Sequence, residues 1–196
     1  MRRTAYSFLA LAWLFAGAAS HGHGGLVDST TIEDQCIAYY QTGNVFDLLS
    51  LVEAPWYQVW VWPSTSRIKP ECKTVKFNRL TIHVARHMLD GCNRIKLYNN
   101  QTVVQTSTQN MAGRWSNDTY IGNDEVKVLY RSCSHISKYM FQQISTIHVL
   151  GINCSTGGRA VLLSQLLPKR AHIQKIVDDI EVMIGRDGGP ACELPF

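Results

Sequence analysis

The sequence lacks the features that mark membrane-spanning, nucleic-acid-binding and zinc-thiolate proteins. Beyond the first twenty residues, no apolar run approaches the length of a membrane-spanning helix. The formal charge of +4 falls to +2 without Arg2 and Arg3 (17 basic minus 15 acidic residues), a surplus too small to favour nucleic acid or an anionic membrane. No Cys-x-x-Cys pair exists, which disfavours a zinc site built from thiolates. We therefore expect no nucleic-acid partner, no membrane span and no metal centre.

Signatures of hydrolytic enzymes are missing as well. The sequence has no Gly-x-Ser-x-Gly elbow, no His-Glu-x-x-His and no pair of carboxylates at helical spacing. Its serines, histidines and acids follow no spacing that joins them into a catalytic group. We predict that the protein is not an enzyme and has no catalytic residues.

The N-terminus has the pattern of a secretory signal peptide, predicted to cover residues 1–20. A basic start and a short apolar run lead to small residues at 18–20, where cleavage is expected. Residues 21–35 are predicted to form a flexible arm. After cleavage, the new amino terminus and the imidazole at position three of His21-Gly22-His23 could wrap Cu(II), or the arm is simply a disordered leader. Residues 36–196 are predicted to form a single domain.

The cysteines and glycosylation sequons fit a secreted, extracellular protein. An even number of cysteines after a signal peptide predicts three disulfides formed in an oxidising compartment. The sequence alone leaves their pairing open. The six cysteines are Cys36, Cys72, Cys92, Cys133, Cys154 and Cys192, and the sequons begin at Asn100, Asn117 and Asn153.

A stretch rich in tryptophan, residues 56–62, predicts the first strand of the domain. Trp56, Gln58, Trp60 and Trp62 alternate with Tyr57, Val59 and Val61, and this period of two is typical of a strand with two different faces. A face with three tryptophans must look into a core or a cavity, because exposing it would lose a large burial free energy. We interpret this strand as the first wall of a β-barrel.

Later segments predict more strands and one helix. Strands are expected at 72–77 with a continuation at 80–84, and at 94–99, 102–108, 125–131, 146–154 and 159–165, while 110–124 reads as a long connection. Apolar residues at helical spacing predict one amphipathic helix at about 169–185, packed on the outside. The predicted fold class is all-β: an eight-stranded antiparallel up-and-down barrel with one C-terminal α-helix.

This order of features resembles the lipocalin family, and within it the arthropod branch of apolipoprotein D, bilin-binding protein and insecticyanin. Phe46-Asp47 before Trp56-Tyr57 is similar to the family's first motif, although Ala54 replaces its glycine. The family's Thr-Asp-Tyr is replaced by Gln143-Ile144-Ser145, and its later arginine by Gln165. We therefore interpret the chain as a divergent lipocalin-like protein.

Cysteine spacing is the stronger part of the resemblance. The branch has one cysteine before the first strand, one opening the second, one ending the seventh and one in the C-terminal tail. The resemblance then implies the pairs Cys36–Cys154 and Cys72–Cys192, and leaves Cys92–Cys133 as an extra bridge. With all six cysteines in bridges, none remains for the isomerase chemistry that a reactive cysteine gives some lipocalins.

The resemblance also implies a ligand inside the barrel, at its open end, with Trp56 closing the other end as core. Alternation along the expected strands predicts a mainly aromatic and apolar wall, suited to a flat or elongated lipophilic molecule. Because no Asp or Glu falls on the inward face, amine binding ranks low. The predicted ligand-binding residues are Gln58, Trp60, Trp62, Val75, Phe77, Leu97, Asn99, Val128, Tyr130, Val149 and Val161.

The histidines give no clear metal or haem site. In the expected strand His83 and His87 would share a face but lie about 13 Å apart, too far for one metal ion. Haem held by one histidine remains open for His83, His87, His135 or His148, and none stands out. No cofactor is required, while a bilin or haem stays possible.

Two functions follow from this reading. The first is a secreted carrier of a small hydrophobic ligand such as a lipid, sterol, retinoid-like molecule or bilin. The alternative is an interaction module: a barrel packed shut by Trp60, Trp62 and Phe77 that acts on a protein partner through its loops, as salivary or immune-modulating lipocalins do. The sequence leaves open whether the protein is a monomer or a homo-oligomer.

Overall fold

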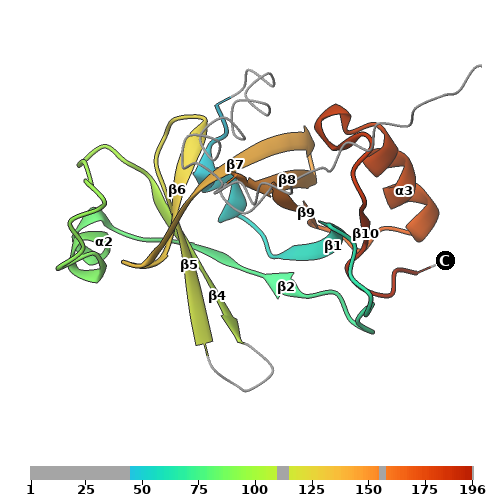
Figure 1. The fold of residues 1–196 in the computed structure, drawn as a ribbon, viewed down its shortest axis with the longest axis horizontal. Coiled ribbons are helices and arrows are strands. Elements are labelled where there is room, and N and C mark those ends of the chain that lie inside the picture. The colour runs from blue at the N-terminus through green and yellow to red at the C-terminus, as the bar shows by residue number, and fades with distance from the viewer. Residues whose placement is uncertain (1–44, 110–114, 155–157, 196) are drawn as a thin grey trace, which may run out of the picture.

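The computed structural model describes residues 45–109, 115–154 and 158–195, and its strands form a curved antiparallel sheet with a helix on each side (Figure 1). The predicted signal peptide and arm lie outside the described residues. The elements are η2 (Leu48–Leu51), β1 (Trp56–Trp62), β2 (Thr74–Val75), β3 (Phe77–Arg79), α2 (Ile82–Met88), β4 (Val103–Gln109), β5 (Trp115–Ile121), β6 (Val126–Ser132), β7 (His135–Ser145), β8 (His148–Asn153), β9 (Arg159–Ser164), α3 (Arg170–Asp178), η4 (Glu181–Met183) and β10 (Gly189–Pro190).

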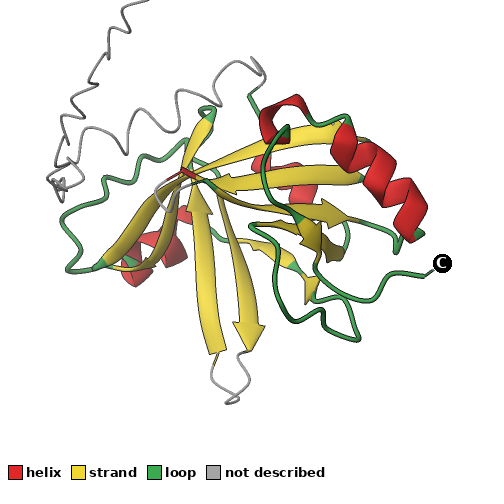
Figure 2. Ribbon diagram, turned by 45° about the vertical axis from the view of Figure 1, so that its right-hand side comes forward, coloured by secondary structure: helices red, strands yellow, loops and turns green. Residues whose placement is uncertain are grey.

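The sheet forms a nearly closed barrel. From β3 to β9 each strand pairs antiparallel with its neighbour in the chain, and β9 returns to pair with β1. β2 pairs with β1 and β3 pairs with β4, and only Lys76 separates β2 from β3. Counted as one interrupted strand, β2 and β3 complete a circuit of eight strands. The predicted all-β up-and-down barrel is confirmed, and Figure 2 shows its strands wrapping around a common interior.

One end of the barrel is closed by a short helix and a tryptophan. Asp47 caps η2, since its Oδ1 accepts a hydrogen bond of 2.9 Å from the Leu49 amide. Trp56 is 1% exposed, and its Nε1 donates to the Leu51 carbonyl at 2.9 Å. Burying such a side chain with its N–H satisfied stabilises the fold by about 3 kcal/mol. Trp56 is therefore core, as predicted.

A β-bulge in β1 reverses the faces of the strand. Gln58 lies opposite Leu163 and Trp60 lies opposite Leu162, so two residues of β1 advance while β9 advances by one. Trp60 and Trp62 consequently leave the interior and pack outside, in a cluster with residues of α3 and η4. The prediction that both tryptophans line the interior is wrong.

The C-terminal segment covers this outer face. Ile173 of α3 and Met183 of η4 are buried against it, and the helix ends at Asp178, earlier than the predicted residue 185. Gly185 follows with a φ of +76°, a conformation that favours glycine. A disulfide between Cys72 and Cys192 ties the tail to the segment before β2.

The opposite side of the barrel carries α2, where the sequence predicted the strand continuation 80–84. Thr81 caps this helix, because its Oγ1 accepts from the Val84 amide at 3.3 Å. The cap and the burial of Ala85 outweigh the strand preference of the β-branched residues. Residues 94–99, predicted as a strand, form an irregular segment that packs beside α2.

Two strands were missed by the sequence reading. β5 lies within residues 110–124, predicted as a connection, and β7 is an eleven-residue strand for which no strand was predicted. β5 is stabilised along its whole length by pairing with β4, from Val103 opposite Ile121 to Gln109 opposite Trp115. Such long-range pairing forms a strand even where local residues favour a turn.

Candidate ligand-binding site

Aromatic rings fill most of the barrel interior. Phe141 of β7 lies at their centre, with ring centroids 5.4 Å from Phe46, 6.4 Å from Phe77, 5.1 Å from Tyr120 and 4.8 Å from Tyr139. These separations are those of favourable stacked and edge-to-face pairs. The rings form one buried cluster with Trp56 at the closed end.

A small cavity remains above these rings. It has a volume of about 50 Å³, well under the roughly 300–1,000 Å³ that is usual for drug-sized ligands. Aromatic and aliphatic side chains line it together with polar and charged ones. The lining residues are Gln58, Lys73, Val75, Phe77, Thr106, Thr108, Asp118, Tyr120, Tyr139, Phe141, Val161 and Leu163.

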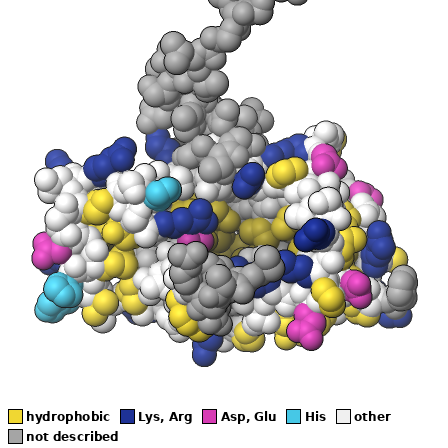
Figure 3. All heavy atoms as spheres, turned by 60° about the horizontal axis from the view of Figure 1, so that its bottom comes forward, with side chains coloured by type: hydrophobic (Ala, Val, Ile, Leu, Met, Phe, Trp, Pro, Cys, Tyr) yellow, Lys and Arg dark blue, Asp and Glu magenta, His cyan; other side chains and the backbone are white. Residues whose placement is uncertain are grey.

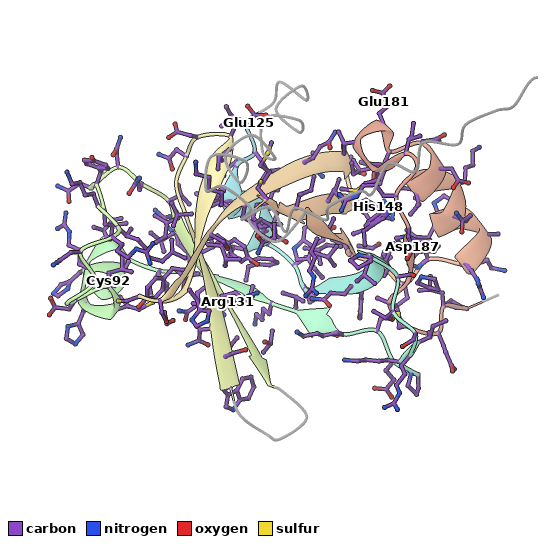
Figure 4. The ribbon with its side chains drawn as sticks, in the orientation of Figure 1. Cys92, Glu125, Arg131, His148, Glu181 and Asp187 are labelled. Atoms are coloured by element: carbon purple, nitrogen blue, oxygen red, sulfur yellow. A yellow bond between two sulfur atoms is a disulfide. The ribbon has the colours of Figure 1, made fainter. Side chains whose placement is uncertain are left out.

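A bidentate ion pair marks the open end of the barrel. Asp118 and Arg131 lie one residue beyond the last paired residues of β5 and β6, which brings their side chains together. Arg131, which is labelled in Figure 4, donates from Nε at 2.7 Å and from Nη2 at 2.9 Å to the two carboxylate oxygens of Asp118. The hydrogen bond to Asp118 raises the pKa of Arg131. The carboxylate is thus neutralised within the barrel mouth.

Lys73 lines the same cavity and has no such partner. Burial lowers its pKa, and the attraction of Asp118 offsets this only in part. Within the described part of the chain its ammonium group forms no hydrogen bond or ion pair. The mouth therefore holds one partly dehydrated cation that is not neutralised.

Two tyrosines line the same cavity as the charged groups. Tyr120 and Tyr139 share a side-chain hydrogen bond, and burial raises the pKa of both well above the ordinary value. Both phenols stay neutral at physiological pH and can donate hydrogen bonds. Tyr139 lies against Gly151, where a Cβ atom would be 2.5 Å from the hydroxyl oxygen.

The structure places some predicted ligand-binding residues in the interior. Gln58, Val75, Phe77 and Val161 line the cavity. Val149 belongs to the ring cluster beneath it.

The other predicted ligand-binding residues lie elsewhere. For Trp60 and Trp62 the reason is the bulge described above. On β6 the alternation was assigned in the wrong phase, so Leu129 and Arg131 are on the inner side while Val128 and Tyr130 pack against α2. Leu97 packs in that same outer cluster, and Asn99 is exposed, where it accepts a hydrogen bond from Arg86.

Several residues that line the cavity were not predicted from the sequence. Tyr139 and Phe141 alternate within β7, a signal that a period-two search of residues 135–145 could have found. Asp118 and Tyr120 alternate in the same way within β5. The residues missed are Lys73, Thr106, Thr108, Asp118, Tyr120, Tyr139, Phe141 and Leu163.

The histidines do not gather at the cavity. His83 and His87 lie on helix α2 rather than on a strand, and both are exposed. His148 is buried on the outer side of β8, and His135 starts β7 beside two serines. Among the described residues, no group of three or more metal-ligating side chains is close enough to hold a metal ion.

The cysteines show one difference from the expected pairing. Cys72 and Cys192 are joined as the resemblance implied, and Cys154 is also disulfide-bonded. The predicted pair Cys36–Cys154 involves a residue outside the described part of the chain. Cys92 and Cys133 are separate thiols in contact, and the hydrogen bond to Cys133 raises the pKa of Cys92.

The sequons differ in accessibility. Asn100 and Asn117 are exposed and can carry a glycan without disturbing the core. Asn153 is 7% exposed and its Nδ2 donates to the Ser137 hydroxyl at 3.4 Å, so a glycan there would displace a buried contact. None of the described helices is both long and apolar enough to cross a membrane.

Comparison with known proteins gives likenesses of fold only at low identity. No protein-family model and no curated protein matches the sequence. Lobster apocrustacyanin A1 is 11% identical, with a TM-score of 0.43 over 83% of this chain and 86% of that chain. Apocrustacyanin C1 is 10% identical, with a TM-score of 0.43 and the same coverage. A biogenic amine-binding protein is 10% identical, with a TM-score of 0.40 over 77% of this chain and 87% of that chain. The nearly closed antiparallel barrel with its C-terminal helix follows from the strand pairing of this chain itself.

Proposed function

We propose that the protein is a secreted carrier that binds a small hydrophobic ligand at the barrel mouth and holds an acidic head group of that ligand at Lys73. The observation that carries this proposal is the half-buried ammonium group of Lys73, which lines the cavity without a partner beside an ion pair that is already satisfied. Leaving a charge partly dehydrated is costly to folding, and a bound anion would repay that cost.

The shape of the mouth supports an amphipathic ligand. Figure 3 looks onto the side of the molecule with a hollow, where hydrophobic side chains form the floor and Lys and Arg side chains lie around it. With only about 50 Å³ free inside, the apolar body rests on the aromatic floor or displaces a ring rather than descending to Trp56. Within the lipid, sterol, retinoid-like and bilin candidates, this favours the members that carry a carboxylate.

An amine is a poorer fit to this mouth. The sequence reading placed no carboxylate inside, and the structure corrects this, since Asp118 lines the cavity. Both of its oxygens already accept hydrogen bonds from Arg131. An incoming ammonium would therefore compete with a bidentate pair and meet the positive charge of Lys73.

Haem is disfavoured for a different reason. None of the described histidines lines the cavity, so a haem in the interior would lack an axial imidazole. A bilin needs no such ligand and stays within the proposal.

Binding of a matched acid and ester tests the head group. We would titrate cis-parinaric acid and its methyl ester, two fluorescent probes with the same chain, into the protein secreted from eukaryotic cells. We expect the acid to bind about tenfold more tightly than the ester, since a hydrogen bond to a charged group contributes about 1.5–3 kcal/mol. In Lys73→Met this preference should disappear, and in the control Lys76→Met, at an exposed lysine, it should remain. Equal binding of acid and ester by the wild-type protein would refute the role of Lys73.

The second candidate function is the interaction module with a closed barrel. The filled interior favours it, although the rings that fill it are those around Phe141 rather than Trp60 and Trp62. If neither probe binds, and native mass spectrometry of the secreted protein finds no retained small molecule, the carrier proposal fails and this candidate stands.

A further inference from the structure

Helix α2, on the side of the barrel away from α3 (Figure 1), carries two histidines one turn apart, His83 and His87. The sequence reading placed both on a strand, where they would lie about 13 Å apart, too far for one metal ion. On the helix that the structure shows, residues four apart are neighbours, with Cβ atoms about 5–6 Å apart. The reason for setting this pair aside therefore no longer holds.

The packing of α2 turns both imidazoles toward solvent. Ala85, midway between them, is 0% exposed, and Leu89 is 7% exposed, so the side of the helix that carries these two residues packs on the barrel. At about 100° per residue, His83 and His87 point about 160–200° away from Ala85. Both histidines are exposed, and no other described residue forms a hydrogen bond or ion pair with either imidazole. An ion from solvent can therefore reach both rings.

Both histidines line one open groove beside the helix, with a volume of about 610 Å³. Asp90 lines it too, and its amide donates to the His87 carbonyl at 3.2 Å, which holds this carboxylate in the turn directly after the helix. Arg86 contributes the opposite charge, and its guanidinium donates to the side-chain oxygen of Asn99. The carboxylate of Asp90 thus offsets the positive charge of Arg86, which would otherwise repel a cation in the groove.

Two imidazoles at this spacing form the start of a metal site. A His-x-x-x-His pair presents both rings on one helix face, and imidazole nitrogens are good ligands for divalent transition metals such as Zn(II). Among the described residues, no third ligand is close enough to complete the set, so water would fill the remaining positions. An exposed site with two protein ligands and water binds its metal reversibly, unlike a closed structural zinc site.

We propose that His83 and His87 together bind a divalent transition-metal ion, with Zn(II) as the ion that suits the pair, on the solvent side of α2. This proposal revises the expectation of no metal centre, which rested on the missing Cys-x-x-Cys pairs and on the strand placement of the two histidines. The groove shares no lining residue with the barrel mouth. The inference therefore goes beyond the proposed carrier function and does not depend on it.

Calorimetric titration of Zn(II) into the secreted protein tests the proposal. Zn(II) is used because the predicted arm at His21–His23 suits the square-planar ions Cu(II) and Ni(II) instead. We expect a binding event that either His83→Gln or His87→Gln weakens by about a hundredfold, since linking a second ligand raises affinity by about 10²–10⁴-fold. His135→Gln, at another exposed histidine, is the control and should leave this binding unchanged.

The imidazole C–H signals of the wild-type protein give a second reading by NMR. Zn(II) should shift two of them together, and the signals missing in the two variants identify them as those of His83 and His87. Because both side chains are exposed, the glutamine variants should keep the urea midpoint of the wild-type protein.

Two results would overturn the proposal. One is an unchanged affinity and stoichiometry for Zn(II) in both histidine variants, because the metal would then bind elsewhere, for example at the Cys92 and Cys133 thiols. The other is a wild-type protein in which Zn(II) moves neither the His83 nor the His87 signal.

Discussion

Replacing Phe141 with alanine tests whether the barrel interior is packed by its own side chains. Phe141 is 3% exposed and contacts four other rings. Replacing a buried phenylalanine with alanine lowers the free energy of unfolding by about 3–5 kcal/mol. Because Phe141 also loses its aromatic contacts, we expect Phe141→Ala to cost about 4–5 kcal/mol. Phe141→Leu keeps most of the volume and should cost only about 1–2 kcal/mol. The alanine variant would thus lose a large part of a typical stability of about 5–15 kcal/mol.

Urea unfolding followed by circular dichroism measures this cost, provided that the slope with urea is the same for each variant. The matched control is Leu166→Ala, at a leucine that is 62% exposed, where the change should stay within about 0.5 kcal/mol. If Phe141→Ala lowers the free energy of unfolding by less than about 1 kcal/mol, the ring cluster is not close-packed and the interior is an open cavity after all.

Three further predictions concern pH, packing and thiols. Burial lowers the pKa of His148 below 6.5. As the pH drops from about 7.5 to about 5, the unfolded chain therefore binds a proton more readily than the folded protein does, and the urea midpoint should fall. His148→Gln should reduce this dependence of the midpoint on pH. Gly151→Ala places a Cβ atom 2.5 Å from the hydroxyl oxygen of Tyr139, so it should destabilise the protein by about 1–3 kcal/mol in the same urea assay, and an unchanged midpoint would contradict the placement of the ring. The Cys92 and Cys133 thiols already contact each other, so oxidation during secretion should join them; Ellman titration of the denatured protein should find no free thiol, and two would show that the pair stays reduced.

Local sequence patterns correctly predicted those strands whose pairing in the sheet agrees with their local preference. The alternation around Trp56 and the apolar runs of β8 and β9 gave strands close to their observed positions. The segment of α2 was misread because Ile82 and Val84 favour a strand, while the deciding features are the cap at Thr81 and the burial of the helix on the barrel. A single capping residue is a weak signal in the sequence, but in the folded protein it helps to determine that residues 82–88 form a helix.

The charged part of the candidate site could not be predicted from local patterns. Asp118 lies in a strand that carries Asn117 and is followed by Gly122 and Asn123, so the segment looks like a connection. Its partner Arg131 comes from the next strand, and the two meet only because β5 and β6 pair in one register. Register follows from the closure of the whole barrel, and no single segment contains that information.

The bulge at Val59 decides on which side of β1 the tryptophans Trp60 and Trp62 lie. Without it, strict alternation would point Trp60 and Trp62 inward with Gln58, into a space that the rings around Phe141 already fill. One extra residue in β1 turns both indoles outward, where they anchor the C-terminal segment. Lys73 is then the partly buried cation that remains at the mouth of the interior. A Lys73→Met variant that loses the acid probe but keeps the urea midpoint of the wild-type protein would establish that this cation binds the ligand rather than stabilising the barrel.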